Sequence, residues 1–261
     1  MTVKLAYLLR QRPNLATKDF QRLWLDNHGP LVASFQTALN LVKYVQTHRL
    51  PGDMDESLRT SREMLCVKNE APFDIFDEYY FDGSMQDFES NLLTPEGRQA
   101  WEALIKDEEK YIDFAGSQMF FVQEIPQILP GPHDTLIASE FNHILRAVAL
   151  ADTSEGGFTY WLNGHAPLVR RWATVMGYEK YIQNHPLQAS ILGTLQKERR
   201  MPAARYSWYT NIWVNSRVNY DAKYQEGLAE IRTDEDSGFM AAGSMSCFLA
   251  KEHIFVDKYR S

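Results

Sequence analysis

The sequence predicts an α+β protein built from two fused ferredoxin-like domains, each with the strand and helix order βαββαβ. The segment WLDNHGPLV, Trp24 to Val32, returns 137 positions later as WLNGHAPLV, Trp161 to Val169. At the same offset, KYVQTHRL from Lys43 aligns with KYIQNHPL from Lys180. Because these matches need no gap, they indicate two copies of one domain.

The first copy shows the periodicities of all six elements. An apolar run, Leu5–Leu9, predicts the first strand. Thr17 is expected to cap a helix whose Phe20, Trp24, His28 and Leu31 share one face. The later elements are strands over Tyr44–His48, Phe73–Phe81 and Met119–Glu124, and a helix from Thr94-Pro95-Glu96 to Leu104. This order is that of the ferredoxin-like unit.

The second copy repeats this order with a less regular start to its first helix. Its expected strands are Ile144–Leu150, Tyr181–His185, Arg205–Val214 and Ser246–Ala250, and its helices are Thr153–Met176 and Asn219–Thr233. Long loops are expected in both copies, at Pro51–Arg62 and Gln188–Ala203. Between the copies, Glu124–Thr135 carries three prolines and a glycine, which interrupt helices and strands. We therefore place copy 1 at 1–128, a linker at 129–137 and copy 2 at 138–261.

Composition excludes several classes of function. The formal net charge is −7 and no cluster of Lys and Arg resembles a phosphate-binding surface, so nucleic acid is not an expected partner. Cys66 and Cys247 lie far apart without metal-ligand spacing, so neither a disulfide framework nor a zinc site is expected. No window approaches the ~20 apolar residues of a membrane span, and the start of the chain lacks the apolar stretch of a signal peptide. We expect a cytoplasmic protein with no membrane partner.

The segment KLAYLLRQRPNLATKDFQRLWLDNHGPLV, followed by KYVQTH, resembles the EthD family of the dimeric α+β barrel superfamily. The first copy carries the motif fully, and the second has Ala166 in place of Gly29. The resemblance implies that two antiparallel sheets pair into one barrel with helices outside. A tandem chain would form this pair within itself, as an intramolecular pseudo-dimer, and a further homodimer is allowed but not required. It also implies an apolar inner face for each sheet.

The repeated helix is expected to direct its histidine toward the sheet. Trp24 and His28 are one turn apart on one face, and Pro30 lacks the N–H that a regular helix requires. We expect a kink that frees carbonyl groups near Asp26 and opens a cleft. His28 and His165 would then either donate to those carbonyls and hold the kink, or reach a ligand in the cleft and transfer protons.

The second strand of each copy adds polar groups to one face. Tyr44, Gln46 and His48 alternate along the first copy, and Tyr181, Gln183 and His185 are their counterparts. Such a face either lines the cleft or forms a hydrogen-bonded structural network.

The third strands of the copies differ in charge. Glu78 corresponds to Asn211 and Asp77 to Thr210, so carboxylates occur only in the first copy. Glu78 is therefore a candidate partner of His28, whereas Asp74 and Asp77 are expected to face solvent in part. The aromatic residues Tyr79, Tyr80, Trp208, Tyr209 and Trp213 would wall a pocket or fill the core.

Two hypotheses for function follow. By resemblance, the first is a cofactor-free lyase, decarboxylase or cyclase acting on an aromatic or polyketide-like acid. The second is a non-catalytic, small-molecule-binding or accessory protein of a degradative pathway. A cleft with Glu78 or His48 in reach of His28 would favour the enzyme, and a filled core around His28 the accessory protein. The candidate catalytic residues are His28, Glu78, His48 and His165, the candidate substrate-binding residues are Trp24, Tyr44, Tyr80, Trp161, Tyr181, His185 and Trp213, and no cofactor or metal is expected.

Overall fold

The computed structural model describes residues 2–131, 135–152, 156–206 and 208–259. The N-terminal half contains β1 (Thr2–Leu9), α1 (Thr17–Leu23), the π-helical turn η1 (Trp24–His28), α2 (Gly29–Ser34), β2 (Leu41–Arg49), α3 (Asp53–Thr60), β3 (Ile75–Asp82), α4 (Met85–Leu92), α5 (Pro95–Glu108) and β4 (Gln118–Ile128). The C-terminal half contains β5 (Ile144–Ala151), α6 (Gly157–Tyr160), the π-helical turn η2 (Trp161–His165), α7 (Ala166–Met176), β6 (Tyr178–Pro186), α8 (Leu192–Glu198), β7 (Trp208–Asn215), α9 (Ala222–Glu235) and β8 (Ser246–Asp257).

The eight strands form one closed antiparallel barrel. The strand order around it is β1-β3-β2-β8-β5-β7-β6-β4, and β4 returns to pair with β1. Four consecutive strands of the barrel come from each half, and β4 and β8 each pair with the second strand of the other half. The expected α+β class and closed barrel are therefore confirmed, and the pairing of β4 with β1 joins the two edges of the sheet.

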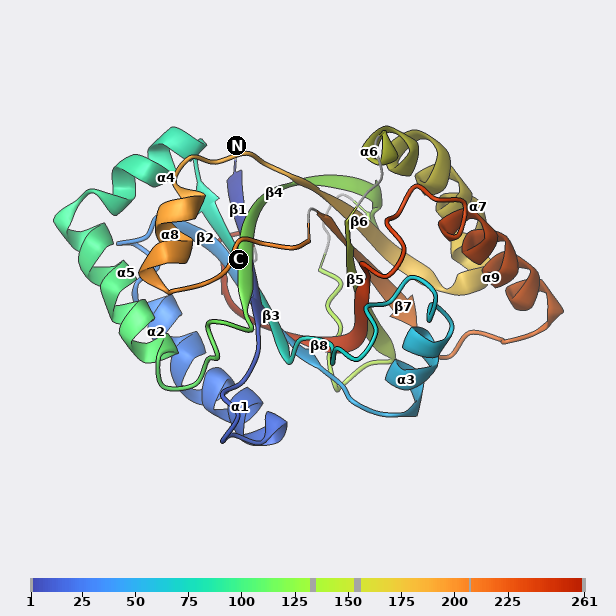
Figure 1. Ribbon diagram of the computed structural model, residues 1–261, viewed down its shortest axis with the longest axis horizontal. Coiled ribbons are helices and arrows are strands. Elements are labelled where there is room, and N and C mark those ends of the chain that lie inside the picture. The colour runs from blue at the N-terminus through green and yellow to red at the C-terminus, as the bar shows by residue number, and fades with distance from the viewer. Residues whose placement is uncertain (1, 132–134, 153–155, 207, 260–261) are drawn as a thin grey trace.

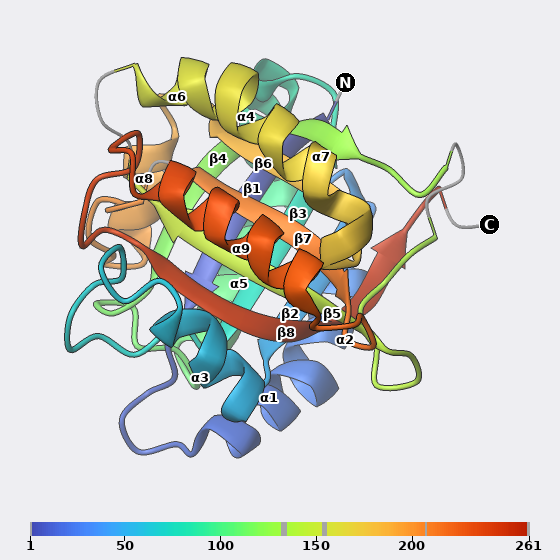
Figure 2. The same ribbon diagram turned by 90° about the vertical axis from the view of Figure 1, so that its right-hand side faces the viewer.

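The helices form a layer on each side of the barrel (Figure 1). Helices α1, α2, α4 and α5 cover the N-terminal half, and α6, α7 and α9 cover the C-terminal half. The view at right angles shows α7 and α9 side by side over the strands of their own half (Figure 2). Helices α3 and α8 are exceptions, because each lies on the side of the opposite half (Figure 1).

Several expected boundaries differ from the observed ones. Ala16, not Thr17, precedes the first helix and no side chain caps it. The expected loops contain α3 and α8, and α4 was not predicted. Strand β4 continues through Pro126, which lies at a register shift where a missing N–H is tolerated. The expected start of the second long helix, Thr153, lies outside the described residues, as does part of the expected linker.

The two faces of the barrel wall hold different side chains. Along β3, Ile75, Tyr79 and Phe81 pack in the apolar core beneath the helices, whereas Phe76 packs in a second core inside the barrel. The inner core occupies only part of the interior. The remaining part is charged, so the expected apolar inner face is wrong for this region.

Glu78 is at the centre of this charged region. Lys4 Nζ lies 2.5 Å from Glu78 Oε1, and Arg146 also pairs with Glu78. Lys4 and Arg146 each bind a second carboxylate, Glu124 and Glu252, at 2.6 and 2.8 Å. Burial would raise the pKa of Glu78, but the two cations hold it well below its usual range. Glu78 is therefore the shared anion of an ion network inside the barrel.

Gly29 is expected to resist substitution. A Cβ atom at this position would lie 2.1 Å from the Phe255 ring, which extends from β8 across the start of α2. We expect Gly29→Ala to lower the free energy of unfolding by about 1–3 kcal/mol, measured by urea denaturation. Adding Phe255→Leu should restore much of the loss. Gly193→Ala in α8 is the control, since nothing lies within 4 Å and alanine favours helix; equal losses in the two variants would contradict the explanation.

Candidate functional site

The repeated WLDNH segment forms a π-helical turn instead of the expected kink. The N–H of Gly29 donates to the Trp24 carbonyl five residues earlier, directly before Pro30. Proline has no N–H for the Asp26 carbonyl, so the wider turn accommodates the missing donor. Gln46 Nε2 also donates to the Trp24 carbonyl, at 3.2 Å. The two parts of the repeated motif therefore contact each other directly.

Asp77 connects the helix and the second strand. Its Oδ2 accepts hydrogen bonds from Trp24 Nε1 at 2.9 Å and from the Tyr44 hydroxyl at 2.7 Å. Gln46 Nε2 donates to the Tyr44 hydroxyl, and Gln46 Oε1 lies 3.1 Å from His48 Nε2. We call these five residues the Asp77 cluster. Asp77, expected to face solvent in part, is fully buried.

His28 lies next to this cluster with both ring nitrogens engaged. Nδ1 lies 2.9 Å from Asp107 Oδ2 and Nε2 lies 3.2 Å from the Tyr79 hydroxyl. The ring stacks on Trp24 at a centroid distance of 3.7 Å and is fully buried. The expected donation to freed carbonyls is wrong, because a carboxylate from the end of α5 and a phenol from β3 take those positions.

The same region matches a known family. Residues 12–115 match the model of the EthD domain. The matched segment lies within the N-terminal half and covers less than half of the chain. It contains η1, β2 and β3, and therefore every residue of the Asp77 cluster as well as His28 and Asp107.

One solved structure shares the fold over nearly the whole chain. An anthrone oxidase-like protein aligns with 98% of this chain and 94% of its own, with a TM-score of 0.56 and 8% identity. An EthD family protein of Bacillus halodurans C-125 is 23% identical over 48% of this chain and all of its own, with a TM-score of 0.31. No curated protein matches the sequence.

The C-terminal half repeats part of the geometry of the N-terminal half. In η2, Ala166 donates to the Trp161 carbonyl, which also accepts from Gln183 Nε2 at 3.0 Å. His165 Nδ1 lies 2.7 Å from Asp234 Oδ2, as His28 does from Asp107. Tyr181 and His185 are bonded to Gln183, as their counterparts are to Gln46. Thr210 replaces Asp77 and Ile212 replaces Tyr79, so the cluster has its acidic member in the N-terminal half and a threonine at that position in the C-terminal half.

Three of the expected site residues face the barrel interior instead. Glu78 contacts Lys4 and Arg146, so its expected pairing with His28 is not found. The Tyr80 hydroxyl donates to Glu124 at 2.8 Å, and Trp213 Nε1 donates to Glu252 at 2.5 Å. Trp161, by contrast, lies under the helices and stacks on His185 at 4.6 Å.

His48 is also in a different environment from the expected one. Its ring lies edge-on to His253 at 4.7 Å, and burial followed by the His253 charge lowers its pKa to about 3. A neutral imidazole that binds Gln46 is suited to a structural network. Burial likewise lowers the pKa of His185.

Sequence reasoning missed the two acidic residues that end each long helix. Asp107 and Glu108 end α5, and Asp234 and Glu235 end α9. In each pair the aspartate binds the histidine of its own half, and the glutamate binds an arginine from the other half. The sequence does contain a pattern that identifies these acidic pairs, because each pair precedes the Ala-Gly-Ser triplet of its own half by the same number of positions.

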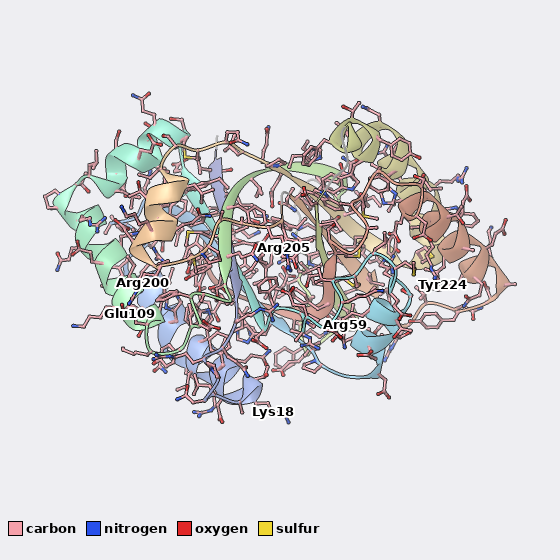
Figure 3. The ribbon with its side chains drawn as sticks, viewed as in Figure 1. Lys18, Arg59, Glu109, Arg200, Arg205 and Tyr224 are labelled. Carbon is pink, nitrogen blue, oxygen red and sulfur yellow. The ribbon has the colours of Figure 1, made fainter. Side chains whose placement is uncertain are left out.

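Two arms supply these arginines. The first arm, residues 51–67, includes α3, and the second, residues 188–203, includes α8. Arg199 Nε lies 2.6 Å from Glu108 Oε2, and Arg62 Nε lies 3.1 Å from Glu235 Oε2. Figure 3 labels Arg200 and Glu109, a second ion pair between the second arm and the end of α5, at 3.3 Å. Each half is therefore attached to the other by an ion pair between its arm and the end of the other half's long helix.

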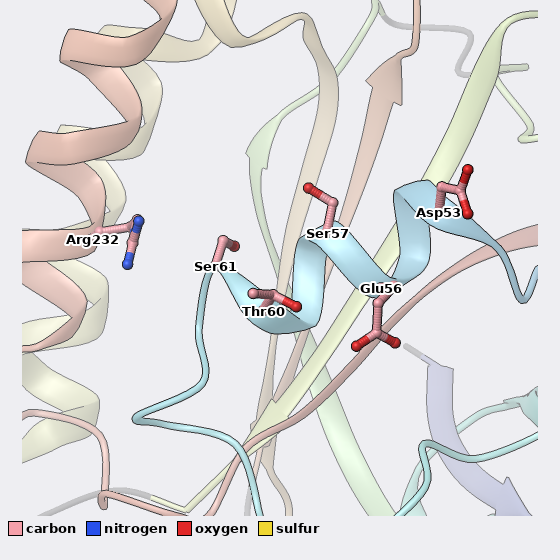
Figure 4. Close-up of a pocket in the computed structure, with 6 residues that line it drawn as sticks. All are labelled: Asp53, Glu56, Ser57, Thr60, Ser61 and Arg232. Atoms are coloured by element: carbon pink, nitrogen blue, oxygen red, sulfur yellow. The ribbon is translucent and has the colours of Figure 1, made fainter.

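A surface hollow of about 560 Å³ lies between the first arm and α9 (Figure 4). Its lining includes Ser57, Ser61 and Arg232, and contains no residue of the Asp77 cluster. In the second arm, Glu198 occupies the position of Ser61 and binds Arg98 and Trp101 of α5. The shorter serine side chain leaves the corresponding space open.

Among the described residues, no helix is long and apolar enough to cross a membrane, and no group of His, Cys, Asp and Glu could hold a metal ion.

Asp77 should make stability depend on pH. Burial raises its pKa to about 8, whereas an unfolded aspartate has a pKa of ~3.9. The stabilising contribution of the protonated group is therefore complete below about pH 4 and is lost as pH rises through 8. We expect the free energy of unfolding of Asp77→Asn, measured by urea denaturation relative to that of wild type, to increase by at least about 2 kcal/mol between pH 5 and pH 8.5. Asp26→Asn, on the exposed side of η1, should show no such change. If the free energy of unfolding of Asp77→Asn and that of wild type change in parallel with pH, the raised pKa of Asp77 is refuted.

Proposed function

We propose that the protein is a non-catalytic accessory protein of a pathway that degrades small molecules. The state of His28 carries this proposal: the ring is fully buried, stacked on Trp24 and bonded to Asp107 and Tyr79. A general base needs its reacting nitrogen within reach of substrate. The histidine and aspartate pair also occurs in the C-terminal half, where Thr210 and Ile212 occupy the positions of Asp77 and Tyr79. A pair common to both halves is explained by attachment of each π-helical turn to its long helix.

The test compares the two histidines. His28→Ala and His165→Ala should both lower the melting temperature, because each leaves a carboxylate, buried Asp107 or half-buried Asp234, with one partner fewer. The wild-type protein, incubated with a panel of aromatic and polyketide-like acids, should leave them unchanged by mass spectrometry. Turnover that disappears in His28→Ala and persists in His165→Ala would overturn the accessory role.

A second candidate is the cofactor-free lyase, decarboxylase or cyclase for an aromatic or polyketide-like acid, and Asp77 favours it. The raised pKa leaves this buried carboxyl largely protonated at neutral pH. Its Oδ1 has no hydrogen-bond partner among the described residues, and Trp24 and Tyr44 lie beside it. Buried carboxyl groups with displaced pKa values are typical of acid–base catalysts. Asp77 would donate the proton, and His28 with Tyr79 would form a proton path in place of Glu78.

Its test uses pH as well as mutation. If Asp77 is the acid, Asp77→Asn should lower kcat at least ~100-fold, and the wild-type kcat should fall as pH rises through 8. Thr210→Asn, at the matched position of the C-terminal half, should change kcat little. A rate that rises across this range would exclude Asp77 as the acid.

We also infer that the chain is two fused EthD-like copies, bounded as 1–128, 129–137 and 138–261. Equal strand order, the two π-helical turns and the reciprocal arms support this. A protease site inserted within 129–137 of the full chain should yield two pieces that elute together in gel filtration. Their separation under native conditions would contradict the inference.

A further inference from the structure

The two cysteines of the chain lie side by side although 181 positions separate them. Cys66 lies in the first arm, after α3, and forms a parallel bridge to Met245. Cys247 follows in β8, and the two sulfur atoms are 3.9 Å apart. Both are free thiols. The contact joins an arm of one half to a strand of the other.

The two thiols have different surroundings. Cys66 is half-buried, and Cys247 is 1% exposed beneath the helices of the C-terminal half. The contact with Cys247 and the charges of Arg62 and Arg59 lower the pKa of Cys66. The contact with Cys66 and burial raise the pKa of Cys247. Since the thiolate is the nucleophile, Cys66 is the more reactive of the two.

A small cavity gives access to the pair. It has a volume of about 20 Å³, enough for one water-sized molecule, and both cysteines, Arg59, Glu70 and Tyr206 contribute to its lining. Arg59, labelled in Figure 3, brings a positive charge to the site from α3. An uncharged small oxidant can therefore reach Cys66, whereas bulky reagents have less access to Cys247.

We propose that Cys66 and Cys247 form an oxidant-reactive dithiol whose substrate is hydrogen peroxide and whose product is an intramolecular disulfide between the first arm and β8. The Cys66 thiolate attacks one oxygen of hydrogen peroxide, the O–O bond breaks, and hydroxide leaves. The resulting Cys66 sulfenic acid reacts with the Cys247 thiol, forming the S–S bond and releasing water. The peroxide is reduced by two electrons, and the two thiols supply them.

The geometry needs only a local change. A disulfide requires the sulfur atoms to approach by about 2 Å more, which side-chain rotation and small movement of the arm provide. The product would fix the first arm, and with it Arg62, against the C-terminal half. Arg62 binds Glu235, next to the aspartate that holds His165. Oxidation would therefore secure the contact between the halves.

The experiment treats the reduced, full-length protein with hydrogen peroxide. The intact mass should fall by two hydrogens without dimer formation, and peptide mapping should find Cys66 joined to Cys247. Before oxidation, Cys66 should react with iodoacetamide at least ~tenfold faster than Cys247. Oxidation should also raise the melting temperature and slow proteolysis within residues 51–67.

Two variants separate the steps. Cys247→Ser should accumulate a sulfenic acid at Cys66 that dimedone traps, whereas Cys66→Ser should leave Cys247 unmodified. The proposal is overturned if peroxide leaves both wild-type thiols reduced, if the disulfides are only intermolecular, or if Cys247 is alkylated first. The wild-type measurements decide the question even if a variant fails to fold.

Discussion

Glu78→Ala is expected to lower the free energy of unfolding by about 3–5 kcal/mol. Lys4 and Arg146 are 2% and 1% exposed, and both bind this carboxylate inside the barrel. Without it, each buried cation keeps one carboxylate partner, Glu124 for Lys4 and Glu252 for Arg146. Urea denaturation at pH 7 measures the loss.

Matched variants test whether charge is the cause. Glu78→Gln keeps the size and the acceptor oxygen but removes the charge, and should recover only a minor part of the loss. Glu78→Leu combined with Lys4→Met and Arg146→Met should recover most of it, because an apolar set needs no counterion. A loss below about 1 kcal/mol in Glu78→Ala would show that water reaches the interior.

Arg199→Met is expected to lower the free energy of unfolding to a similar extent, because Arg199 attaches the second arm to Glu108. It removes both hydrogen bonds to Glu108, at 2.6 and 2.9 Å, and leaves a buried carboxylate with the Tyr7 hydroxyl at 3.2 Å. The expected loss is about 3–5 kcal/mol. Limited proteolysis within residues 188–203 should accelerate, since the arm loses its buried attachment.

The first arm offers the matched comparison. Arg62 and Glu235 are 12% and 10% exposed, against 1% for Arg199 and Glu108. Arg62→Met should therefore lower the free energy of unfolding less than Arg199→Met does. A double-mutant cycle of Arg199→Met with Glu108→Gln should show coupling, with the double variant more stable than the sum predicts. Additive losses would mean that the arm is held by apolar packing alone.

Periodicity was sufficient to predict the barrel strands and the long helices. Strands such as Tyr44–His48 alternate clearly, and the observed β2, Leu41–Arg49, extends the prediction by three residues at its start and one at its end. The arms could not be recognised, because α3 and α8 are short and their attachment depends on single arginines. Isolated helices of this length are marginal, and tertiary contacts stabilise them.

The candidate site was predictable only in part. The repeated motif identified Trp24, His28 and Gln46, and these do lie together. Asp107 was not foreseen because it is 79 positions from His28 along the chain. Glu78 was assigned to the wrong face because β3 is buried on both sides, so its alternation does not reveal which side meets the helices.

Glu78 and Asn211 occupy equivalent positions of the two halves and bind each other, although they are different residues. The Asn211 amide donates to Glu78 Oε1 at 3.2 Å across the barrel interior. In an assembly of two identical chains these positions would have to be the same residue. Two glutamates would place like charges in contact, and two asparagines would deprive Lys4 and Arg146 of their shared anion. Covalent linkage removes this symmetry constraint, so one carboxylate and one amide can occupy positions that identical subunits could fill only with a conflict.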